Sequence, residues 1–364
     1  MSTVVAKIGT SSITDDAGTL QVAAIESLCA QVATARLAGH SVVVVTSGAI
    51  AAGLPLLGLG AERPRDAQTL QAVSAVGQSR LMAAYGDALA RHDLVPGQVL
   101  LAPLDFMVRA QYLKARQTLL RLLELGVVPV VNENDAVADD EIRFGDNDRL
   151  AALVAHLIDA EVLVLLTDTE GVLTADPRLD ANASLITEIL EVDQALEQVA
   201  GGPGTTRGSG GMASKLAAAK LAAWTGVRTV IAASQRPDVL ADAIADTAGV
   251  GTIVRPHDRR LPARKLWIAF AVGSEGRIRI DEGAEEAVRT GTASLLAAGV
   301  VDVEGAFATM DPVEVVGPSG VVAKGLVAHD ADTVRAMAGR RSSDLEPGLD
   351  ACVIHVDDLV VVPA

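Results

Sequence analysis

The sequence predicts an α/β protein with a mostly parallel sheet flanked by helices on both faces, followed by a small β-rich domain at the C-terminal end. Three observations support this prediction. Short β-branched runs alternate with longer helix-like segments through the first two thirds of the chain. This alternation fades after about Val254, and short strand-like runs separated by Gly, Pro and Asp turns follow it.

Five apolar runs are predicted to be strands, because their continuous hydrophobicity is typical of strands buried on both faces. They span residues 4–8, 41–45, 127–131, 162–166 and 228–232. The intervening segments are predicted to be helices, with examples at residues 23–37, 71–91 and 110–125. Further on, strands are expected at residues 277–280, 313–316 and 351–356.

These elements divide the chain into an α/β domain at residues 1–254 and a β-rich domain at residues 277–364. Residues 255–276 are predicted to be a linker, because the segment 255–265 is basic and contains two prolines.

Composition narrows the class of protein. The chain has 364 residues, of which 50% are hydrophobic, so it can bury a sizeable core. No apolar stretch approaches the roughly 20 residues of a membrane helix, and no signal-peptide pattern is present, so we expect a cytoplasmic protein without membrane contact. Cys29 and Cys352 lie far apart in the sequence, which argues against a disulfide framework or a zinc site. The net charge of −16 opposes binding to polyanions.

An acidic loop at residues 131–149, VNENDAVADDEIRFGDNDR, directly follows a predicted buried strand. Ligands of open α/β sheets bind beyond the carboxyl ends of the strands, so this loop is a candidate substrate loop. A solvated acidic loop is the alternative. Asn132, Asn134 and Asn147 are interspersed with Asp135 and Asp148, and this mixture suits an ammonium group and a metal-bound phosphate.

Three other polar segments follow predicted strands. Lys7 ends the first strand, and Gly9 allows a ligand to approach the backbone closely. The segment 46–49, TSGA, leaves room for a ligand after the second strand. Thr167 and Asp168 follow a later strand and could meet a nucleotide and its metal. A strand-to-helix turn remains the alternative for the first two of these segments, and the third carries little weight by itself.

The glycine-rich segment 201–215, GGPGTTRGSGGMASK, leads into a predicted helix. It fits neither the P-loop nor the dinucleotide-binding pattern. Ordering a loop so rich in glycine costs conformational entropy. The loop is therefore either one that a bound ligand orders, or a flexible hairpin or linker. Lys215, at the start of the helix, favours a ligand, because with Lys7 it would place two positive charges beside a phosphoryl group.

Taken together, the motifs KIGTSS, TSGAIAAG, NENDAV, FGDND, LLTD, ADPR and GSGGMASK resemble those of the amino-acid kinase family, over nearly the whole chain. The acidic loop resembles that of the members that act on glutamate. The resemblance implies ATP-dependent phosphorylation of the γ-carboxylate of L-glutamate to L-glutamyl 5-phosphate, the first step of proline biosynthesis, with Mg²⁺ accompanying ATP. It also implies feedback inhibition by proline, and we expect a homo-oligomer.

The resemblance assigns roles by motif position. Lys7 and Lys215 would act in phosphoryl transfer, and Asp148 would orient both lysines. Glutamate would bind to Ser47, Asp135 and Asn147, with Asp135 holding the α-ammonium group. ATP would bind to Lys7, Gly9, Thr167, Asp168, Ser209, Gly210, Gly211, Met212, Ala213, Ser214 and Lys215. Residues that ligate the metal stay unassigned.

The C-terminal domain resembles the PUA domain, a module often found in RNA-modifying enzymes. Residues 277–364 contain seven Lys or Arg and fifteen Asp or Glu, a net charge of −8, whereas binding to a phosphate backbone needs a basic surface. We therefore expect a structural or regulatory domain and no nucleic-acid partner. Two alternative functions remain: another small-molecule kinase of the same family, and a non-catalytic protein that binds RNA or senses an amino acid.

Overall fold

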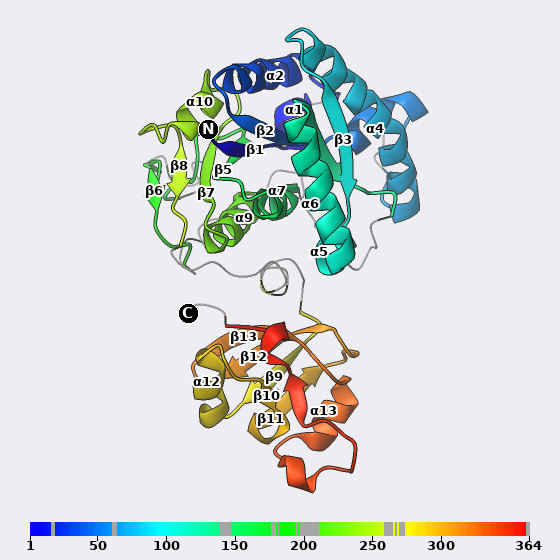
Figure 1. Ribbon diagram of the computed structural model, residues 1–364, viewed down its shortest axis with the longest axis vertical. Coiled ribbons are helices and arrows are strands. Elements are labelled where there is room, and N and C mark those ends of the chain that lie inside the picture. The colour runs from blue at the N-terminus through cyan, green and yellow to red at the C-terminus, as the bar shows by residue number, and fades with distance from the viewer. Residues whose placement is uncertain are drawn as a thin grey trace. The chain divides into compact units, whose positions relative to one another are not determined.

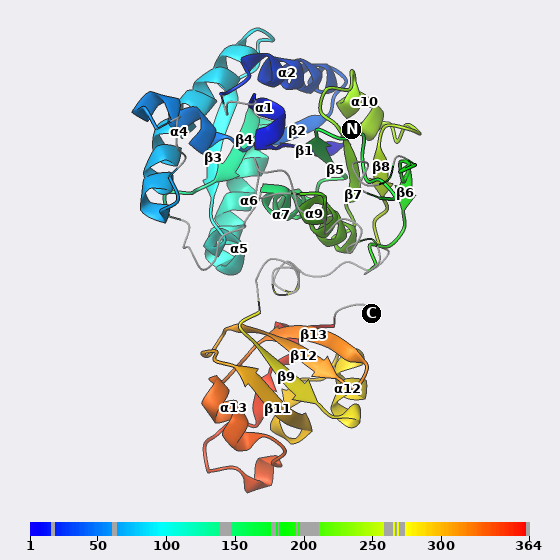
Figure 2. The same ribbon diagram turned by 180° about the vertical axis from the view of Figure 1, so that it is seen from behind.

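The computed structural model describes residues 1–15, 19–59, 64–137, 147–175, 180, 182–193, 196, 211–257, 265, 268 and 274–361. The chain forms two compact units, residues 1–260 and residues 261–364. Figures 1 and 2 show the elements of each unit from opposite sides.

The first unit is built on a sheet of eight described strands in the order β3-β4-β2-β1-β5-β7-β8-β6. Neighbouring strands are parallel except for β7 and β8, so the prediction of a mostly parallel sheet is confirmed. The strands are β1 (Thr3–Ile8), β2 (Ser41–Val45), β3 (Pro96–Leu101), β4 (Val128–Glu133), β5 (Val162–Thr167), β6 (Glu188–Ile189), β7 (Arg228–Ala233) and β8 (Thr252–Val254).

Helices cover both faces of this sheet. The described helices are α1 (Thr10–Ile13), α2 (Val22–Leu37), α3 (Ala49–Gly53), α4 (Ala67–Ala90), α5 (Leu104–Met107), α6 (Arg109–Glu124), α7 (Asn147–Leu157), α9 (Met212–Trp224) and α10 (Val239–Ile244). Helices α2, α4 and α10 lie on one face, and α6, α7 and α9 lie on the other (Figures 1 and 2). None of the described helices is long and apolar enough to span a membrane.

Strand β1 lies at the centre of the sheet and determines the position of Lys7. Val4, Ala6 and Ile8 belong to the hydrophobic core shared with α2 and α4. Successive side chains of a strand point to opposite faces, so Lys7 lies on the face covered by α7 and α9. A lysine is therefore directed into the interior at the carboxyl end of the central strand.

Helices α3 and α4 cross with their backbones in close contact. A Cβ atom built on Gly77 would lie 1.8 Å from the carbonyl oxygen of Ala49 and 2.4 Å from the backbone nitrogen of Gly53. A Cβ atom on Gly53 would lie 2.1 Å from the carbonyl oxygen of Val73. Only glycines permit this approach, which fixes α4 against the segment that follows β2.

Some features of the sheet differ from the sequence prediction. Strand β3 was not predicted, because Pro96, Gly97 and Gln98 interrupt its apolar pattern. The structure places β3 at the sheet edge, where proline and glycine are tolerated.

Within the predicted linker, Arg255 pairs with Glu188 and Asp246, and the backbone N–H of His257 donates to the carbonyl of Ala223. The described start of that segment thus packs on the first unit.

The second unit contains a five-stranded sheet in the order β11-β9-β12-β13-β15 and a two-stranded sheet of β10 and β14. The strands are β9 (Gly276–Ile280), β10 (Leu295–Leu296), β11 (Val300–Gly305), β12 (Pro312–Gly317), β13 (Gly320–Leu326), β14 (Cys352–Ile354) and β15 (Leu359–Val361), with helices α12 (Glu282–Arg289) and α13 (Ala331–Met337). On β9, Arg277 pairs with Glu314 and Arg279 with Glu304. The β-rich C-terminal domain is confirmed.

The helix crossing gives a first prediction. Gly77→Ala should destabilise the protein by roughly 3 kcal/mol or more, because the added methyl group has to separate two backbones that already touch. Gly86→Ala is the matched control on the same helix, since a Cβ atom at Gly86 meets no atom within 4 Å. It should be neutral or stabilising by up to about 1 kcal/mol. Urea unfolding measures both, and equal stability of the two variants would contradict the close crossing.

Candidate active site

Lys7, Asp148 and Lys215 form a buried ion-pair cluster at the carboxyl end of β1. Asp148 Oδ1 lies 2.6 Å from Lys7 Nζ, and Asp148 Oδ2 lies 3.1 Å from Lys215 Nζ. The Ser214 hydroxyl donates a 2.9 Å hydrogen bond to Asp148 Oδ2. Lys7 is 3% exposed, Lys215 6% and Asp148 0%. Two ammonium groups therefore share one carboxylate, and the cluster keeps a net positive charge.

The electrostatics of this cluster keep Asp148 ionised. Burial pushes the pKa of Asp148 upward, but the charges of Lys7 and Lys215 outweigh burial and hold that pKa below its ordinary value. The position of Asp148 in the first turn of α7 also suits a carboxylate, because the helix dipole is positive there. Gly9 leaves space beside Lys7, since a Cβ atom at this position would lie 3.3 Å from Nζ.

Asn147, the neighbour of Asp148, is held by a cluster of polar groups at the ends of β2 and β4. Its Nδ2 donates to the carbonyl of Thr46, to Asn132 Oδ1 at 2.7 Å and to Ser47 Oγ at 3.1 Å. Asn132 Nδ2 in turn donates to Gln78 Oε1 at 2.8 Å. The structure thus brings the predicted Ser47 and Asn147 together, directly beside the lysine cluster.

Asp135, the third residue predicted to bind substrate, follows β4. Its Oδ2 accepts a 2.5 Å hydrogen bond from the hydroxyl of Ser74 on α4. Gly48, which follows Ser47, adopts φ +96°, a left-handed conformation that favours glycine, and is the N-cap residue of α3. Residues 138–146, between Asp135 and Asn147, lie outside the described residues.

Apart from Lys7 and Gly9 at the end of β1, the described residues predicted to bind the nucleotide lie at the end of β5 and the start of α9. Thr167 ends β5 and is buried, whereas Asp168 is exposed and accepts a 3.1 Å hydrogen bond from the Thr167 hydroxyl. Gly211 is extended and precedes α9, whose first turn carries half-buried Met212 and exposed Ala213. Ser209 and Gly210 lie outside the described residues. No group of three His, Cys, Asp or Glu side chains in the described part of the chain could hold a metal ion.

Helix α4 contributes polar side chains to the site that none of the sequence motifs contains. Ser74, Gln78 and Tyr85 all lie on the buried stripe of this helix. Ser74 contacts Asp135, Gln78 contacts Asn132, and the Tyr85 hydroxyl donates a 2.8 Å hydrogen bond to Thr46 Oγ1. The sequence signal that could have identified them is the spacing of three polar side chains at i, i+4 and i+11 on an otherwise apolar helix face.

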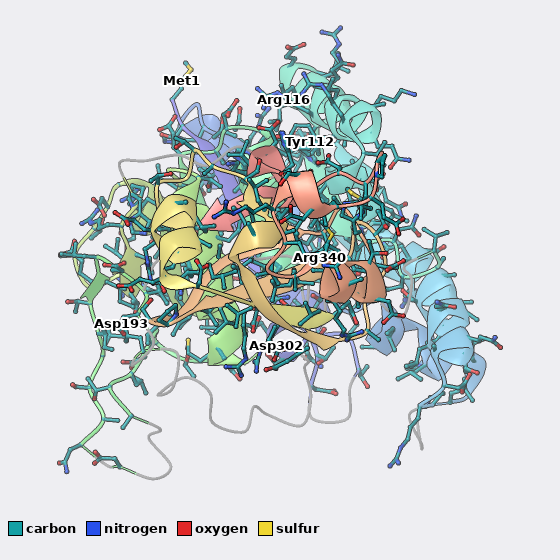
Figure 3. All side chains as sticks on the ribbon, turned by 90° about the horizontal axis from the view of Figure 1, so that it is seen from below. Met1, Tyr112, Arg116, Asp193, Asp302 and Arg340 are labelled. Carbon is teal, nitrogen blue, oxygen red and sulfur yellow. The ribbon has the colours of Figure 1, made fainter. Side chains whose placement is uncertain are left out.

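The far end of α7 is anchored by a residue of α6. Arg116, labelled in Figure 3, donates to the carbonyl of Leu157 and to Asp159 Oδ2 at 2.6 Å. A cation at a helix C-terminus satisfies free carbonyl groups and the dipole. Arg116 thereby helps to fix the helix whose first turn carries Asn147 and Asp148.

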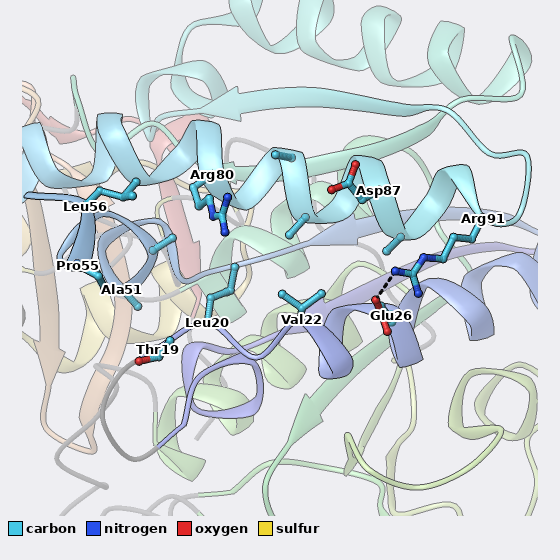
Figure 4. Close-up of a pocket in the computed structure, with 14 residues that line it drawn as sticks. Thr19, Leu20, Val22, Glu26, Ala51, Pro55, Leu56, Arg80, Asp87 and Arg91 are labelled. Atoms are coloured by element: carbon cyan, nitrogen blue, oxygen red, sulfur yellow. Dashed lines mark ion pairs between the residues drawn. The ribbon is translucent and has the colours of Figure 1, made fainter.

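A hollow of about 290 Å³ lies elsewhere on the first unit, between α2, α3 and α4. Leu20, Leu56, Arg80 and Asp87 are among the residues that line it (Figure 4). At one end Arg91 pairs with Glu26 at 2.8 Å. The hollow contains none of the predicted site residues and uses another face of α4 than Ser74 and Gln78 do.

Comparison with known proteins agrees with this fold. Residues 2–233 match the model of the amino acid kinase family, and residues 276–349 match that of the PUA domain. The carbamate kinase from Giardia lamblia bound to AMP-PNP has a similar structure, with a TM-score of 0.51 over 70% of this chain and 99% of that chain. At 18% identity this likeness shows the fold alone.

Relatives that align over nearly the whole chain show its place within the family more closely than the structural likeness does. The glutamate 5-kinase of Burkholderia vietnamiensis is 45% identical over 364 residues, covering 99% of this chain and 97% of that protein. The glutamate 5-kinase of Frankia casuarinae is 47% identical over 365 residues, covering 99% and 96%. The chain therefore belongs to the amino acid kinase family and carries a C-terminal PUA domain. Within this family its full-length similarity is to the glutamate 5-kinases.

The ion-pair cluster gives a second prediction. Asp148→Asn should lower the free energy of unfolding by about 3 kcal/mol or more at neutral pH, because two buried ammonium groups lose their counter-charge. A carboxylate with a lowered pKa stabilises the fold above its unfolded pKa of about 3.9, and this contribution disappears as the pH falls through the lower folded pKa.

The stability difference between the wild-type protein and Asp148→Asn should therefore be constant from about pH 5 to 8 and shrink below about pH 4. Urea unfolding at a series of pH values measures it. A difference that grows as the pH falls from 7 to 5 would mean that Asp148 is not held as an anion between the lysines.

Proposed function

We propose that this chain transfers the γ-phosphoryl group of ATP to the γ-carboxylate of L-glutamate and forms L-glutamyl 5-phosphate, the first step of proline biosynthesis. The main support is the position of two buried lysines on one aspartate, beside an amide cluster at the carboxyl ends of parallel strands. Ligands of open α/β sheets bind at this edge. The names of the full-length relatives support the same reaction.

Phosphoryl transfer requires two anions, the γ-carboxylate of glutamate and the γ-phosphoryl group of ATP, to approach each other against their mutual repulsion. Lys7 and Lys215 are proposed to neutralise the phosphate oxygens as charge develops on them. Asp148 is proposed to position both ammonium groups, because its two oxygens hold one lysine each. Holding these charges in place before ATP arrives avoids reorganisation during the reaction.

On the acceptor side, the γ-carboxylate is already a nucleophile at neutral pH and needs no general base. On this side the protein has only to bind and orient the amino acid. Asp135 and the side chains of Ser47 and Asn147 are proposed to bind the amino acid, with Asp135 facing its α-ammonium group. The positive ammonium group explains why an acidic residue such as Asp135 lies in the binding site of an acidic substrate.

ATP is proposed to bind between the end of β5 and the start of α9, at Thr167, Asp168 and residues 209–215. Mg²⁺ commonly binds through phosphate oxygens, water and one or two carboxylates, which fits a chain whose described residues offer no three-ligand cluster. Asp168 is exposed at this edge and Asp148 already holds two lysines, so Asp168 is the carboxylate suited to the ion. Mg²⁺ would supply neutralisation of phosphate charge.

A homo-oligomer in the cytoplasm stays an expectation.

Loss of the lysines tests the phosphoryl side. Lys7→Ala and Lys215→Ala should each lower kcat by about a hundredfold or more, the scale of losing one preorganised charge. The assay is hydroxamate formation that depends on both ATP and glutamate. Lys220→Ala is a matched control, because Lys220 lies on α9 outside the cluster. Near-normal turnover in either site variant would refute the assignment, and phosphorylation of another acceptor in place of glutamate would indicate a different kinase of this fold.

Proline inhibition tests the acceptor side. Proline has the ammonium and α-carboxylate of glutamate but lacks the reacting γ-carboxylate, so it should compete with glutamate. Asp135→Ala should weaken glutamate and proline together, by about tenfold or more, and leave the ATP KM within about threefold. Proline titrations at several glutamate concentrations measure this. Inhibition that is independent of glutamate, and retained in Asp135→Ala, would place the proline site elsewhere.

A further inference from the structure

The buried stripe of α4 contacts the ends of two strands, β4 and β2, through three side chains. Ser74 reaches Asp135 beyond β4, Gln78 reaches Asn132 on β4, and Tyr85 reaches Thr46 after β2. Gln78 is 8% exposed and Ser74 is 4% exposed, although both are polar. Buried polar groups are costly unless bonded, and Ser74 Oγ and Gln78 Oε1 both bond at the candidate acceptor side, whereas Gln78 Nε2 is buried without a partner among the described residues.

The amide groups of this cluster have a fixed polarity. The carbonyl oxygen of Thr46 can only accept, so Asn147 must direct Nδ2 toward it. The backbone N–H of Glu133 can only donate, and it donates to Asn132 Oδ1 at 2.9 Å. Asn132 must therefore direct Nδ2 the other way, to Gln78 Oε1 at 2.8 Å. Gln78 is the final acceptor of the chain of amides.

This polarity determines what Asn147 can offer a ligand. Its Nδ2 has two hydrogens, and Thr46, Asn132 and Ser47 supply three acceptors for them within the protein. Within the described part of the chain no bond engages Oδ1, so this oxygen is available to a ligand, and an oxygen accepts from an ammonium group. Asp135, held by Ser74, adds a second acceptor.

We propose that Gln78 is a positioning residue of the acceptor site. Through Asn132 it holds Asn147 so that Oδ1, and not Nδ2, faces the α-ammonium group of the amino acid. This inference rests on the proposed function for the identity of the ligand. It extends that function to α4, which the glycine crossing with α3 fixes in place.

Two substitutions separate the acceptor atom of Gln78 from its volume. Gln78→Met keeps the length of the side chain and removes the acceptor, which leaves a buried N–H of Asn132 without a partner. Gln78→Glu keeps an acceptor oxygen in either protonation state. Arg80→Met, on the same helix but in the hollow of Figure 4, is the control for changes in α4 itself.

Gln78→Met should raise the glutamate KM about tenfold and change the ATP KM by less than about threefold, whereas Gln78→Glu and Arg80→Met should stay within about threefold of wild type. An unchanged glutamate KM in Gln78→Met would overturn the inference. So would a tenfold increase in Gln78→Glu, which also decides the question if Gln78→Met does not fold.

A double-mutant cycle tests the route through Asn147. If Gln78 acts by holding Asn147, then Gln78→Met should add little to the glutamate KM of Asn147→Ala. A full tenfold increase in the Asn147→Ala background would show that Gln78 acts by another route and would refute the proposal.

The same cycle in urea unfolding of the ligand-free protein separates this inference from the proposed function. The two substitutions should lower the unfolding midpoint together by clearly less than the sum of their separate effects. Additive midpoints would overturn the amide chain whatever the reaction is. Coupled midpoints in a protein that forms no hydroxamate from glutamate would instead refute the proposed function and the α-ammonium ligand.

Discussion

The carboxylate of Asp148, held between Lys7 and Lys215, is the interaction on which the candidate site depends. Two buried ammonium groups without a counter-ion would destabilise the fold, and a buried carboxylate alone would become protonated. Together they form a cluster in which the two lysines hold the pKa of Asp148 below its ordinary value. The cluster also joins three elements, since Lys7 is on β1, Asp148 on α7 and Lys215 on α9.

The first turn of α7 connects the two halves of the site. Asp148 holds the lysines, and its neighbour Asn147 binds the amide cluster at the ends of β2 and β4. A shift of α7 would therefore disturb the lysine cluster and the amide cluster together, and with them the proposed phosphoryl transfer and acceptor binding. Arg116 at one end of the helix and Asn132 at the other restrain it. The buried alanines of α9 allow that helix to pack closely beside α7.

Much of the fold could be predicted from sequence, because its central strands are continuous apolar runs and its helices are long. The strand at residues 41–45 was predicted with the observed bounds, and the strand at residues 162–166 was one residue short. Strand β3 was missed because edge strands tolerate residues that break the pattern. The antiparallel β8 was not anticipated either, because strand direction depends on the course of the connection.

For the candidate site, sequence motifs selected Lys7, Asn147, Asp148 and Lys215, and the structure brings these residues together. The contribution of Gln78 and Ser74 could not be read from motifs, because both lie within a helix far along the chain from their partners. Their contacts arise from packing, and the crossing of α3 and α4 is visible only in three dimensions.

The most direct test of the account is kcat for Asp148→Asn in ATP- and glutamate-dependent hydroxamate formation. Asparagine keeps the size of the side chain but cannot hold two ammonium groups by charge. The account predicts that kcat falls by about a hundredfold or more while both KM values rise by less than about threefold, because the misplaced charges act on the transition state. A kcat close to that of the wild-type protein, with the variant folded, would contradict the claim that Asp148 positions the catalytic lysines.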